Sequence, residues 1–458
     1  MAFLSCEEML AAARSQKITL AEAVLRSDLE ESRLTEAHSR AAMRHLWQVM
    51  QATSQEYDPA QRSRSGLSGG DAAKVEQAWQ QGRLLGDDYL AAVTAEALKT
   101  AECNACMKRI VAAPTAGSCG VLPAVLLPLA RAGQADEDAV CDALYVAAGF
   151  GQVIAARATL AGAEGGCQAE VGAASAMAAA RSQKITLAEA VLRSDLEESR
   201  LTEAHSRAAM HHLWQVMQAT SQEYDPAQRS RSGLSGGDAA KVEQAWQQGR
   251  LLGDDYLAAV TAEALKTAEC NACMKRIVAA PTAGSCGVLP AVLLPLARAG
   301  QADEDAVCDA LYVAAGFGQV IAARATLAGA EGGCQAEVGA ASAMAAAALC
   351  NLKGGTPEQC AAAAAMALGN LLGLVCDPVA GLVEVPCIKR NVVGAVNAVS
   401  CANMALAGVD YAIPCDEVID AMGRVGSLLS PDLRETGQGG LAATPTGVKI
   451  ARQLAQED

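Results

Sequence analysis

The sequence has few aromatic residues: Phe, Tyr and Trp together make up 3% of its 458 positions. Its core must therefore be built from Ala, Leu, Val, Met and Cys, and hydrophobic residues at 52% supply enough of them. Segments rich in Ala and Leu favour helices, whereas sheets favour aromatic and β-branched residues. Clear alternation of apolar and polar residues is also scarce. We therefore predict an all-α fold.

Positive charge is in deficit. The chain has 36 Lys and Arg against 51 Asp and Glu, a formal net charge of −15. A protein that binds a phosphate backbone needs surplus Lys and Arg, so we expect no nucleic-acid partner. Only 19% of the residues are charged, and the apolar fraction is too high for a disordered chain.

Signals for export and membrane insertion are also lacking. The segment Met1 to Glu8 has no basic start followed by an apolar stretch, so it is not a signal peptide. An odd number of cysteines, 17, does not indicate a disulfide framework, and we expect a cytoplasmic protein with reduced thiols. The uncharged stretch Asn391 to Val409 has the length of a membrane span. Because it holds three Asn residues, we interpret it as a buried helix and expect no membrane partner.

An internal repeat dominates the sequence. Residues Ala11 to Ala180 recur as Ala178 to Ala347, at an offset of 167 residues, and the one difference is Arg44, which becomes His211. Solenoid repeats are far shorter and drift in sequence, so this is one segment copied whole. A recent duplication and an error in assembling the gene explain the near-identity equally well.

The repeat sets the expected domain organisation. Without one copy, the chain has a length that suits one large domain or two small ones. We predict that residues 178–458, the second copy with the unique tail, form a complete domain. Residues 1–177 then form an incomplete copy of its N-terminal part. This first copy would expose the faces meant for the tail helices.

Helices are predicted along the second copy and the tail. Thr186 and Glu189 have the spacing of a capping box, which marks a helix start. Ala- and Leu-rich or amphipathic patterns then predict helices at 202–220, 256–273, 303–328, 340–352 and 357–374. Glycine-rich loops separate them at 230–238 and 281–287.

The placement of cysteine is the most informative feature of the tail. Cys376 and Cys387 lie 11 apart in proline-bounded loops, and Cys334 is flanked by glycines. Three thiolates on such loops could hold an iron–sulfur cluster with one iron open to substrate. Zinc fits less well, because structural zinc sites carry close Cys pairs and no His lies nearby. The alternative is that these cysteines are small core residues.

Two closely spaced cysteine pairs invite a different interpretation. Cys103 and Cys106, with their copies Cys270 and Cys273, have the spacing of a redox or zinc motif. They lie in a predicted helix without a βαβ context, which argues against a thioredoxin-like function. We expect buried, inert thiols there.

The glycine-rich loops at 230–238 and 281–287 are typical of anion binding, because such loops present backbone N–H groups at the positive end of a helix. Ordinary turns between helices are the alternative, and neither loop fits a nucleotide-binding spacing. Lys389 follows Cys387 closely, and its charge could offset an anionic cluster or attract a carboxylate, or simply begin a solvated helix. The candidate substrate-binding residues are Ser232, Ser235, Gly236, Asp238, Thr282, Gly284, Ser285 and Lys389.

Taken together, these segments resemble the α chain of the iron–sulfur-dependent L-serine dehydratases. The resemblance covers essentially the whole chain once one copy is set aside. The matching segments are Arg229 to Asp238, Ile277 to Gly287, Gly333 to Gly339, Cys376 to Pro378, Pro386 to Asn391, and Arg434 to Gly447.

The resemblance implies a cofactor, a reaction and a partner. In this family three cysteines hold a 4Fe–4S cluster, and they correspond to Cys334, Cys376 and Cys387. The implied reaction converts L-serine to pyruvate and ammonia without pyridoxal phosphate. A separate β subunit and an oligomer are also implied, and the catalytic base is not assigned.

The duplication bears on this function. The first copy contains Cys167, the counterpart of Cys334, but Cys376 and Cys387 have no second copy, so one chain can complete one cluster. Two alternatives stay open at this point. One is the same chemistry on another hydroxy amino acid such as threonine, and the other is a non-catalytic iron–sulfur protein.

Overall fold

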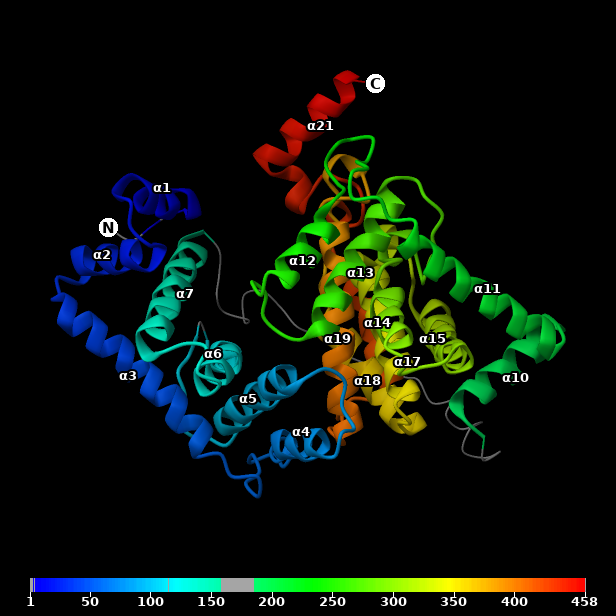
Figure 1. Cartoon of the computed structure of the whole chain (residues 1–458), viewed down its shortest axis with the longest axis horizontal. Coiled ribbons are helices and arrows are strands. Elements are labelled where there is room, and N and C mark those ends of the chain that lie inside the picture. The colour runs from blue at the N-terminus through cyan, green and yellow to red at the C-terminus, as the bar shows by residue number, and fades with distance from the viewer. Residues whose placement is uncertain (1–2, 4, 114, 158–184, 458) are drawn as a thin grey trace. The chain divides into compact units, whose positions relative to one another are not determined.

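The computed structural model describes residue 3 and residues 5–113, 115–157 and 185–457. Over these residues the chain consists of helices joined by loops, without a strand, which confirms the all-α prediction (Figure 1). The chain forms two compact units. The first comprises Met1–Gln80 and Asp88–Gly166, and the second comprises Gln81–Asp87 and Cys167–Asp458. The domain boundary predicted between residues 177 and 178 lies outside the described residues.

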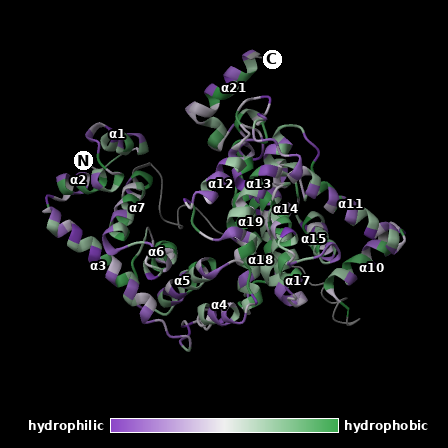
Figure 2. Ribbon diagram, in the orientation of Figure 1, coloured by the Kyte–Doolittle hydropathy of each residue, from purple (hydrophilic) through white to green (hydrophobic). Residues whose placement is uncertain are grey.

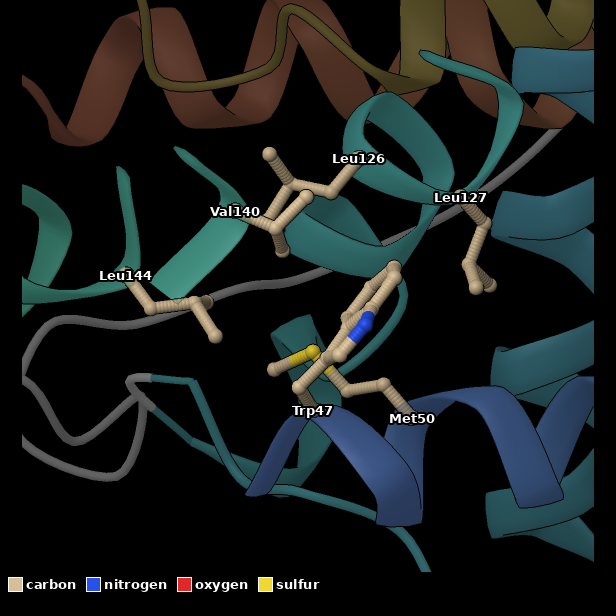
Figure 3. Packing of buried hydrophobic residues seen from close by; sticks show 6 residues of the cluster. All are labelled: Trp47, Met50, Leu126, Leu127, Val140 and Leu144. Carbon is tan, nitrogen blue, oxygen red and sulfur yellow. The ribbon is translucent and has the colours of Figure 1, made fainter. Parts of the chain in front are cut away.

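The first unit packs its helices around a small core with a tryptophan at its centre. Figure 3 shows Trp47 among the side chains of this core, which are Met50 of α3, Leu126 and Leu127 of α6, and Val140 and Leu144 of α7. The elements of the unit are α1 (Cys6–Gln16), α2 (Leu20–Ser32), α3 (Glu36–Gln55), α4 (Asp71–Gln80), α5 (Asp88–Ala105), η1 (Ala116–Ser118), α6 (Val121–Arg131) and α7 (Glu137–Arg157).

The second unit repeats this helix series from the counterpart of α2 onward. Thr186 caps its first described helix by accepting a hydrogen bond from the Glu189 backbone N–H at 3.1 Å, at the predicted start. The repeated elements are α10 (Leu187–Ser199), α11 (Glu203–Gln222), α12 (Asp238–Gln247), α13 (Asp255–Ala272), η2 (Ala283–Ser285), α14 (Val288–Arg298) and α15 (Glu304–Arg324).

The rest of the second unit comes from the end of the second copy and the tail. Its elements are α16 (Gly329–Gly332), the π-helix η3 (Gln335–Gly339), α17 (Ala340–Leu352), α18 (Pro357–Gly369), η4 (Val379–Gly381), α19 (Cys387–Ala407), α20 (Cys415–Leu428), η5 (Pro431–Leu433), η6 (Gly440–Ala443) and α21 (Pro445–Glu457).

Helix α17 is the centre of the second unit. Its residues from Ala340 to Cys350 are all buried, and it packs against α14, α15, α18 and α19. Seven alanines in this run let the neighbouring helices approach closely, because the distance between helix axes depends on side-chain size. Figure 2 shows polar and hydrophobic residues alternating along outer helices such as α3. A core of small side chains thus replaces the aromatic residues that the sequence lacks.

The two copies expose the same residues to different degrees. Val121 of α6 is 60% exposed, whereas its counterpart Val288 of α14 is fully buried. Ile154 of α7 is 48% exposed, and its counterpart Ile321 of α15 is also fully buried. In the second unit these positions lie on the helices that pack against α17. The first copy therefore exposes apolar faces that α17 and the tail helices cover in the second, as the sequence predicts.

The one position that differs between the copies keeps its partner. Arg44 on α3 pairs with Asp138 at 2.9 Å. Its replacement, His211 on α11, contacts the counterpart Asp305 at 3.2 Å and Glu304 at 3.3 Å. Both side chains reach the acidic first turn of the next long helix, α7 or α15, so the substitution keeps a contact with the same carboxylate position.

Among the described residues one helix, α15, is long and apolar enough to cross a membrane by length and composition. Most of its apolar window is buried against its neighbours, as in the core helix of a soluble protein. The uncharged stretch that begins at Asn391 belongs to α19. Asn391 and Asn403 are both buried there and hydrogen-bonded, so the prediction of a buried helix is confirmed.

A buried carboxylate joins three helices of the second unit and gives the first testable prediction. Glu263 accepts hydrogen bonds from Ser221 at 2.5 Å, from Lys266 at 3.0 Å and from Arg298 at 2.6 Å. Burial raises the pKa of Glu263, but Lys266, Ser221 and Arg298 outweigh it, and the net pKa lies below its ordinary value of 4.5. A lowered carboxyl pKa stabilises the fold above the unfolded-state pKa, and that contribution is lost as the pH falls through the folded-state pKa.

We expect Glu263→Gln to lower the free energy of unfolding at pH 7 by about 2 kcal/mol, the scale of a hydrogen bond to a charged group. The loss of stability between pH 6 and about pH 3 should also become shallower. Urea unfolding across this range measures both effects. The control is Glu243→Gln, which removes a more exposed partner of Lys266 and should change stability by less than about 1 kcal/mol. An unchanged pH dependence in Glu263→Gln would contradict the prediction.

Candidate functional site at three buried cysteines

Cys334 lies where the chain turns from a short helix into a π-helix. It follows Gly333, whose φ of +76° favours glycine, and it precedes η3. The buried side chain of Gln335 fixes this turn. Its amide donates to the Gly332 carbonyl at 2.8 Å, and its oxygen accepts from the Gly373 N–H at 2.8 Å. π-helices are rare and often occur at functional sites. The turn holds the buried Cys334 thiol in a defined place.

Cys376 and Cys387 come from two segments of the tail. Cys376 lies in an extended stretch that pairs with the chain at Arg434, where the Cys376 N–H donates to the Leu433 carbonyl at 2.9 Å. Cys387 is the first residue of α19, directly after Pro386. The N-terminus of a helix favours negative charge, which suits a thiolate at this position. Both cysteines are buried, as Cys334 is.

The three thiols lie close enough to influence one another. Burial raises the pKa of Cys334 to about 11 and that of Cys387 to about 12. Burial also raises the pKa of Cys376, and the nearby groups Glu337, Cys334 and Cys387 raise it further. At neutral pH the free thiols are therefore protonated. A bound metal would supply the positive charge that stabilises thiolates here, since coordinating thiols lose their protons.

A buried ion pair holds the cysteine segments together. Arg390, one turn after Cys387 on α19, forms an ion pair with Asp377 at 2.8 Å and donates to the Val375 carbonyl at 2.8 Å. Its guanidinium also interacts with Cys334. Asp377 is anchored further by the Leu441 N–H, which donates to it at 2.7 Å. Arg390 thus brings a fixed positive charge to the thiols and links all three segments.

Glu337 connects the cysteines to a glycine-containing loop. Its Oε1 accepts from the Thr282 hydroxyl at 2.8 Å, and its Oε2 lies 3.7 Å from the Cys376 sulfur. Burial is the main cause that raises the pKa of Glu337, against the hydrogen bond from Thr282, which lowers it. Glu337 was not among the predicted site residues. A lone carboxylate three positions after Cys334 in an Ala-rich segment is the signal that could have identified it.

Two glycines leave room around this group. A Cβ at Gly329 would lie 2.6 Å from the Glu337 carboxylate and 3.0 Å from the Cys376 sulfur. A Cβ at Gly284 would lie 3.2 Å from the same carboxylate. Only glycine allows the backbone to approach this closely. The backbone therefore forms a cradle beside the Cys376 thiol that any side chain would fill.

The chemistry of these side chains fits a metal cluster held by thiolates. In the described part of the chain, no three His, Cys, Asp or Glu side chains converge as ligands of one ion do. In a multi-iron cluster the cysteine ligands bind different irons, so they surround a volume rather than a point. Three buried thiols from separate segments, with Arg390 nearby and glycines that leave space beside Cys376, would suit ligands that surround such a volume.

The loop predicted around Thr282, Gly284 and Ser285 lies at this site. Its short helix η2 is fixed by Asn391 of α19, which donates to the Gly284 carbonyl at 2.8 Å and accepts from the Gly287 N–H at 2.8 Å. The Ser285 side chain is buried, and its hydroxyl lies 3.2 Å from that of Thr282. The structure thus brings Thr282 and its loop together with Glu337 and Cys376.

The second predicted loop is tied to the tail by a carboxylate. Glu384, three residues before Cys387, accepts from the Ser230 hydroxyl at 2.7 Å and from the Ser232 hydroxyl at 2.8 Å. Ser235 is buried in the same loop. Ser232 therefore connects to the segment that leads into Cys387.

The anion-binding end of this loop already holds an anion of the chain. The N–H groups of Gly237 and Asp238 donate to the Glu269 carboxylate at 3.1 and 2.8 Å. The sequence pattern around Gly236 thus corresponds to a real anion site at the start of α12, but Glu269 of α13 fills it. A substrate role for Gly236 and Asp238 stays a prediction.

Asp238 and Lys389 lie in a groove that is separate from the three cysteines. The Lys389 ammonium donates to Asp238 at 2.6 Å, and the two line a largely apolar groove between α12, α13 and α19. The three cysteines do not line this groove. Lys241, also paired with Asp238, lowers the pKa of that carboxyl together with Lys389. Lys389 therefore points to Asp238, and a substrate role for it also stays a prediction.

The first copy lacks the partners that complete the site. Thr115 and Ser118 keep the local geometry of Thr282 and Ser285, with hydroxyls 3.2 Å apart. Cys167 lies outside the described residues. Of the close cysteine pairs, Cys103 and Cys270 are buried as predicted, and burial raises their pKa values. Their hydrogen bonds to main-chain carbonyls fit inert core thiols. Cys106 and Cys273 are only half-buried, because each follows the last residue of its helix, so the prediction of a buried thiol is wrong for these two.

The second unit is a helical domain that brings three buried cysteines together with an arginine and a carboxylate. Comparison with known proteins identifies its family. The family model described as "Serine dehydratase alpha chain" matches residues 15–183 and again 182–442. The chain belongs to the serine dehydratase alpha chain family, and each copy matches it separately.

Individual relatives each match part of the chain. The probable L-serine dehydratase alpha chain of Bacillus subtilis is 46% identical over 274 residues, 60% of this chain and 91% of the relative. The L-serine dehydratase alpha chain of Peptoniphilus asaccharolyticus is 44% identical over 274 residues, 60% of this chain and 94% of the relative. L-serine dehydratase 2 of Escherichia coli is 45% identical over 181 residues, 39% of this chain and 40% of the relative.

Proposed function

We propose that this chain is the α subunit of an L-serine dehydratase, which converts L-serine to pyruvate and ammonia at a 4Fe–4S cluster. The observation that carries the proposal is the meeting of three buried thiols from separate segments beside Arg390 and Glu337. The names of the relatives, which are L-serine dehydratases, support the substrate and the reaction. Pyridoxal phosphate has no part in this proposal.

In the proposal Cys334, Cys376 and Cys387 hold the cluster. When bound, the cluster supplies an iron without a protein ligand, and such an iron acts as a Lewis acid toward a hydroxyl group. The reaction is a loss of water from serine, and hydrolysis of the resulting enamine–imine then releases ammonia and leaves pyruvate.

The residues of this chain would orient the substrate and exclude water. The loop of Thr282 lies against Glu337, and Glu337 lies against Cys376, so a substrate held by this loop is held next to the cluster. Backbone N–H groups of such a loop suit a substrate carboxylate. Fixing the substrate in one orientation lowers the entropic cost of reaching the transition state. Burial of all three thiols keeps bulk water away from the centre.

A separate β subunit is part of the proposal. The Bacillus and Peptoniphilus relatives are named alpha chains, and this chain covers nearly their full length. The L-serine dehydratase of Mycobacterium tuberculosis, named without a subunit, is matched over only 58% of its length. The remaining part of that longer relative is the region that a separate β subunit would supply here. The described cysteines are all free thiols, which fits the proposed cytoplasmic location.

Substrate turnover tests the proposed reaction. The chain is purified without oxygen together with a β subunit, loaded with iron and sulfide, and supplied with L-serine, L-threonine or D-serine. We expect pyruvate and ammonia in equal amounts from L-serine, and little product from the other two. Faster turnover of L-threonine would show that another hydroxy amino acid, not L-serine, is the preferred substrate. A loaded protein that releases no ammonia from any of them would contradict the enzymatic function.

A further inference from the structure

A short segment of the first copy belongs to the second unit. This segment, Gln81–Asp87, joins α4 to α5 in sequence but clusters with the second unit in space. The N–H of Leu85 donates to the side-chain oxygen of Asn403 at 2.7 Å, and the Asn403 amide donates to the Leu85 carbonyl at 2.8 Å. Arg83 donates to the Leu406 carbonyl at 2.9 Å. Three hydrogen bonds and the buried Leu84 thus seat this segment on α19.

Asn403 has the properties of a receptor for a main chain. Its side chain is buried on α19, and both halves of its amide are satisfied by the two main-chain groups of Leu85. A buried amide without hydrogen-bond partners costs free energy, so the Asn403 side chain is stable here only when a main-chain segment binds to it. The receptor lies in the unique tail and therefore occurs once in each chain.

The identical segment of the second copy leaves its second leucine, Leu252, exposed. Gln248–Asp254 has the same sequence, and its local shape is the same: Arg83 donates to Gln81 at 2.9 Å, and Arg250 donates to Gln248 at 2.8 Å. Yet Leu252 is 56% exposed, whereas its counterpart Leu85 is 2% exposed. The same hydrophobic loop is therefore seated in one copy and open in the other.

The two equivalent loops approach each other within the second unit. Asp87 and Asp254 occupy the same position of the two copies and lie close enough for the charge of Asp87 to act on Asp254. In a symmetric dimer, a residue near the two-fold axis faces its own equivalent, and each subunit offers the same patch to the other. A symmetric dimer of chains without the duplication would have two such loops and two tails with Asn403. The duplicated chain has both loops but only one tail, so it can form one of the two equivalent contacts.

We propose that the face of α19 around Asn403 and Leu406 is a self-association site for the loop Gln248–Asp254 of a second copy of this chain. In the duplicated chain, the first copy's loop Gln81–Asp87 fills this site from within. The duplication therefore replaces a contact between two chains by a contact within one, and it keeps the full chain, purified without a β subunit, from pairing with a second copy. This inference does not depend on the proposed lyase function.

Identical residues in the two loops allow a matched test in the full chain. Leu85→Asp removes the internal occupant and frees the site, so the loop of Leu252 from another chain can dock. We expect the wild type to sediment with the monomer mass of 46.8 kDa and the Leu85→Asp variant with twice that mass. Leu252→Asp alone should stay monomeric, and the double variant Leu85→Asp/Leu252→Asp should return to the monomer mass.

Each other outcome overturns the inference. A monomeric Leu85→Asp variant would show that the freed face does not bind a second copy. A dimeric variant that stays dimeric when Leu252→Asp is added would mean that another surface is used. A dimeric wild type would show that the first copy does not block association. Circular dichroism checks helix content, and Leu85→Ser replaces the Asp variant if the latter loses it.

Discussion

Cys376→Ala is expected to remove both the visible absorbance of the reconstituted cluster and pyruvate formation, which should fall to background. The reason is that Cys376 is one of three thiols around the proposed centre, and it is the one that contacts Glu337. With only two thiolates left, the cluster loses a ligand that no other residue of the site replaces. Absorbance after anaerobic loading and pyruvate from L-serine are measured on the same sample.

A matched control separates this effect from the loss of a core thiol. Cys415 at the start of α20 is as buried as Cys376, and burial raises its pKa as well, with Asp416 as the charged group beside it. Cys415→Ala should keep the absorbance and the activity. If Cys376→Ala kept either property, Cys376 would not be a ligand.

Arg390→Met is expected to lower the free energy of unfolding by about 3–5 kcal/mol, because it leaves Asp377 charged and buried without its cation. It also removes the donor to the Val375 carbonyl, which fixes the chain next to Cys376. Urea unfolding of the protein without iron measures this effect separately from cluster loss. Cluster loading should also fall, since the fixed positive charge beside Cys334 is lost.

The neighbouring residue provides the control. Lys389 lies on the same helix turn and forms an exposed ion pair with Asp238, so Lys389→Met should change the free energy of unfolding by less than about 1 kcal/mol. The double variant Arg390→Met/Asp377→Asn removes the unpaired charge and should recover part of the stability. An Arg390→Met variant as stable as Lys389→Met would show that the buried pair does not hold the site together.

Much of the helical fold could be predicted from the sequence. The predicted helix 340–352 has the limits of α17, and the predicted start at Thr186 has its cap. The helix predicted over 357–374 ends earlier, at Gly369. An Ala- and Leu-rich segment continues past that point without a periodic signal, so only the tertiary structure determines where the helix stops.

Only part of the candidate site could be predicted. Local patterns in the sequence indicated its loops, but they do not reveal which side chains from distant segments contact one another. Glycine and proline around the cysteines indicated loops, and the structure places these loops together. The partner of Arg390 could not be predicted, because the link to Asp377 depends on how α19 begins. The sequence indicates a loop that could bind an anion, and in the structure the N–H groups of Gly237 and Asp238 do hold one. That anion is Glu269, from the next helix in the chain, which no local pattern reveals.

The repeat contains two identical loops whose different burial cannot be predicted from the sequence. The loops Gln81–Asp87 and Gln248–Asp254 are identical in sequence, yet one is seated on α19 and the other is exposed. No property of the segment itself distinguishes them. The difference arises because the receptor Asn403 occurs once, so only one of two equal loops can be seated.

The most direct test of the proposed function is pyruvate formation from L-serine by one anaerobically loaded sample, measured before and after exposure to air. The chain is loaded with iron and sulfide in the presence of its β subunit. We predict a brown protein with one cluster per chain, because Cys376 and Cys387 occur once. Its pyruvate formation should disappear together with the brown colour in air. A colourless protein, or activity that survives the loss of colour, would contradict the proposal.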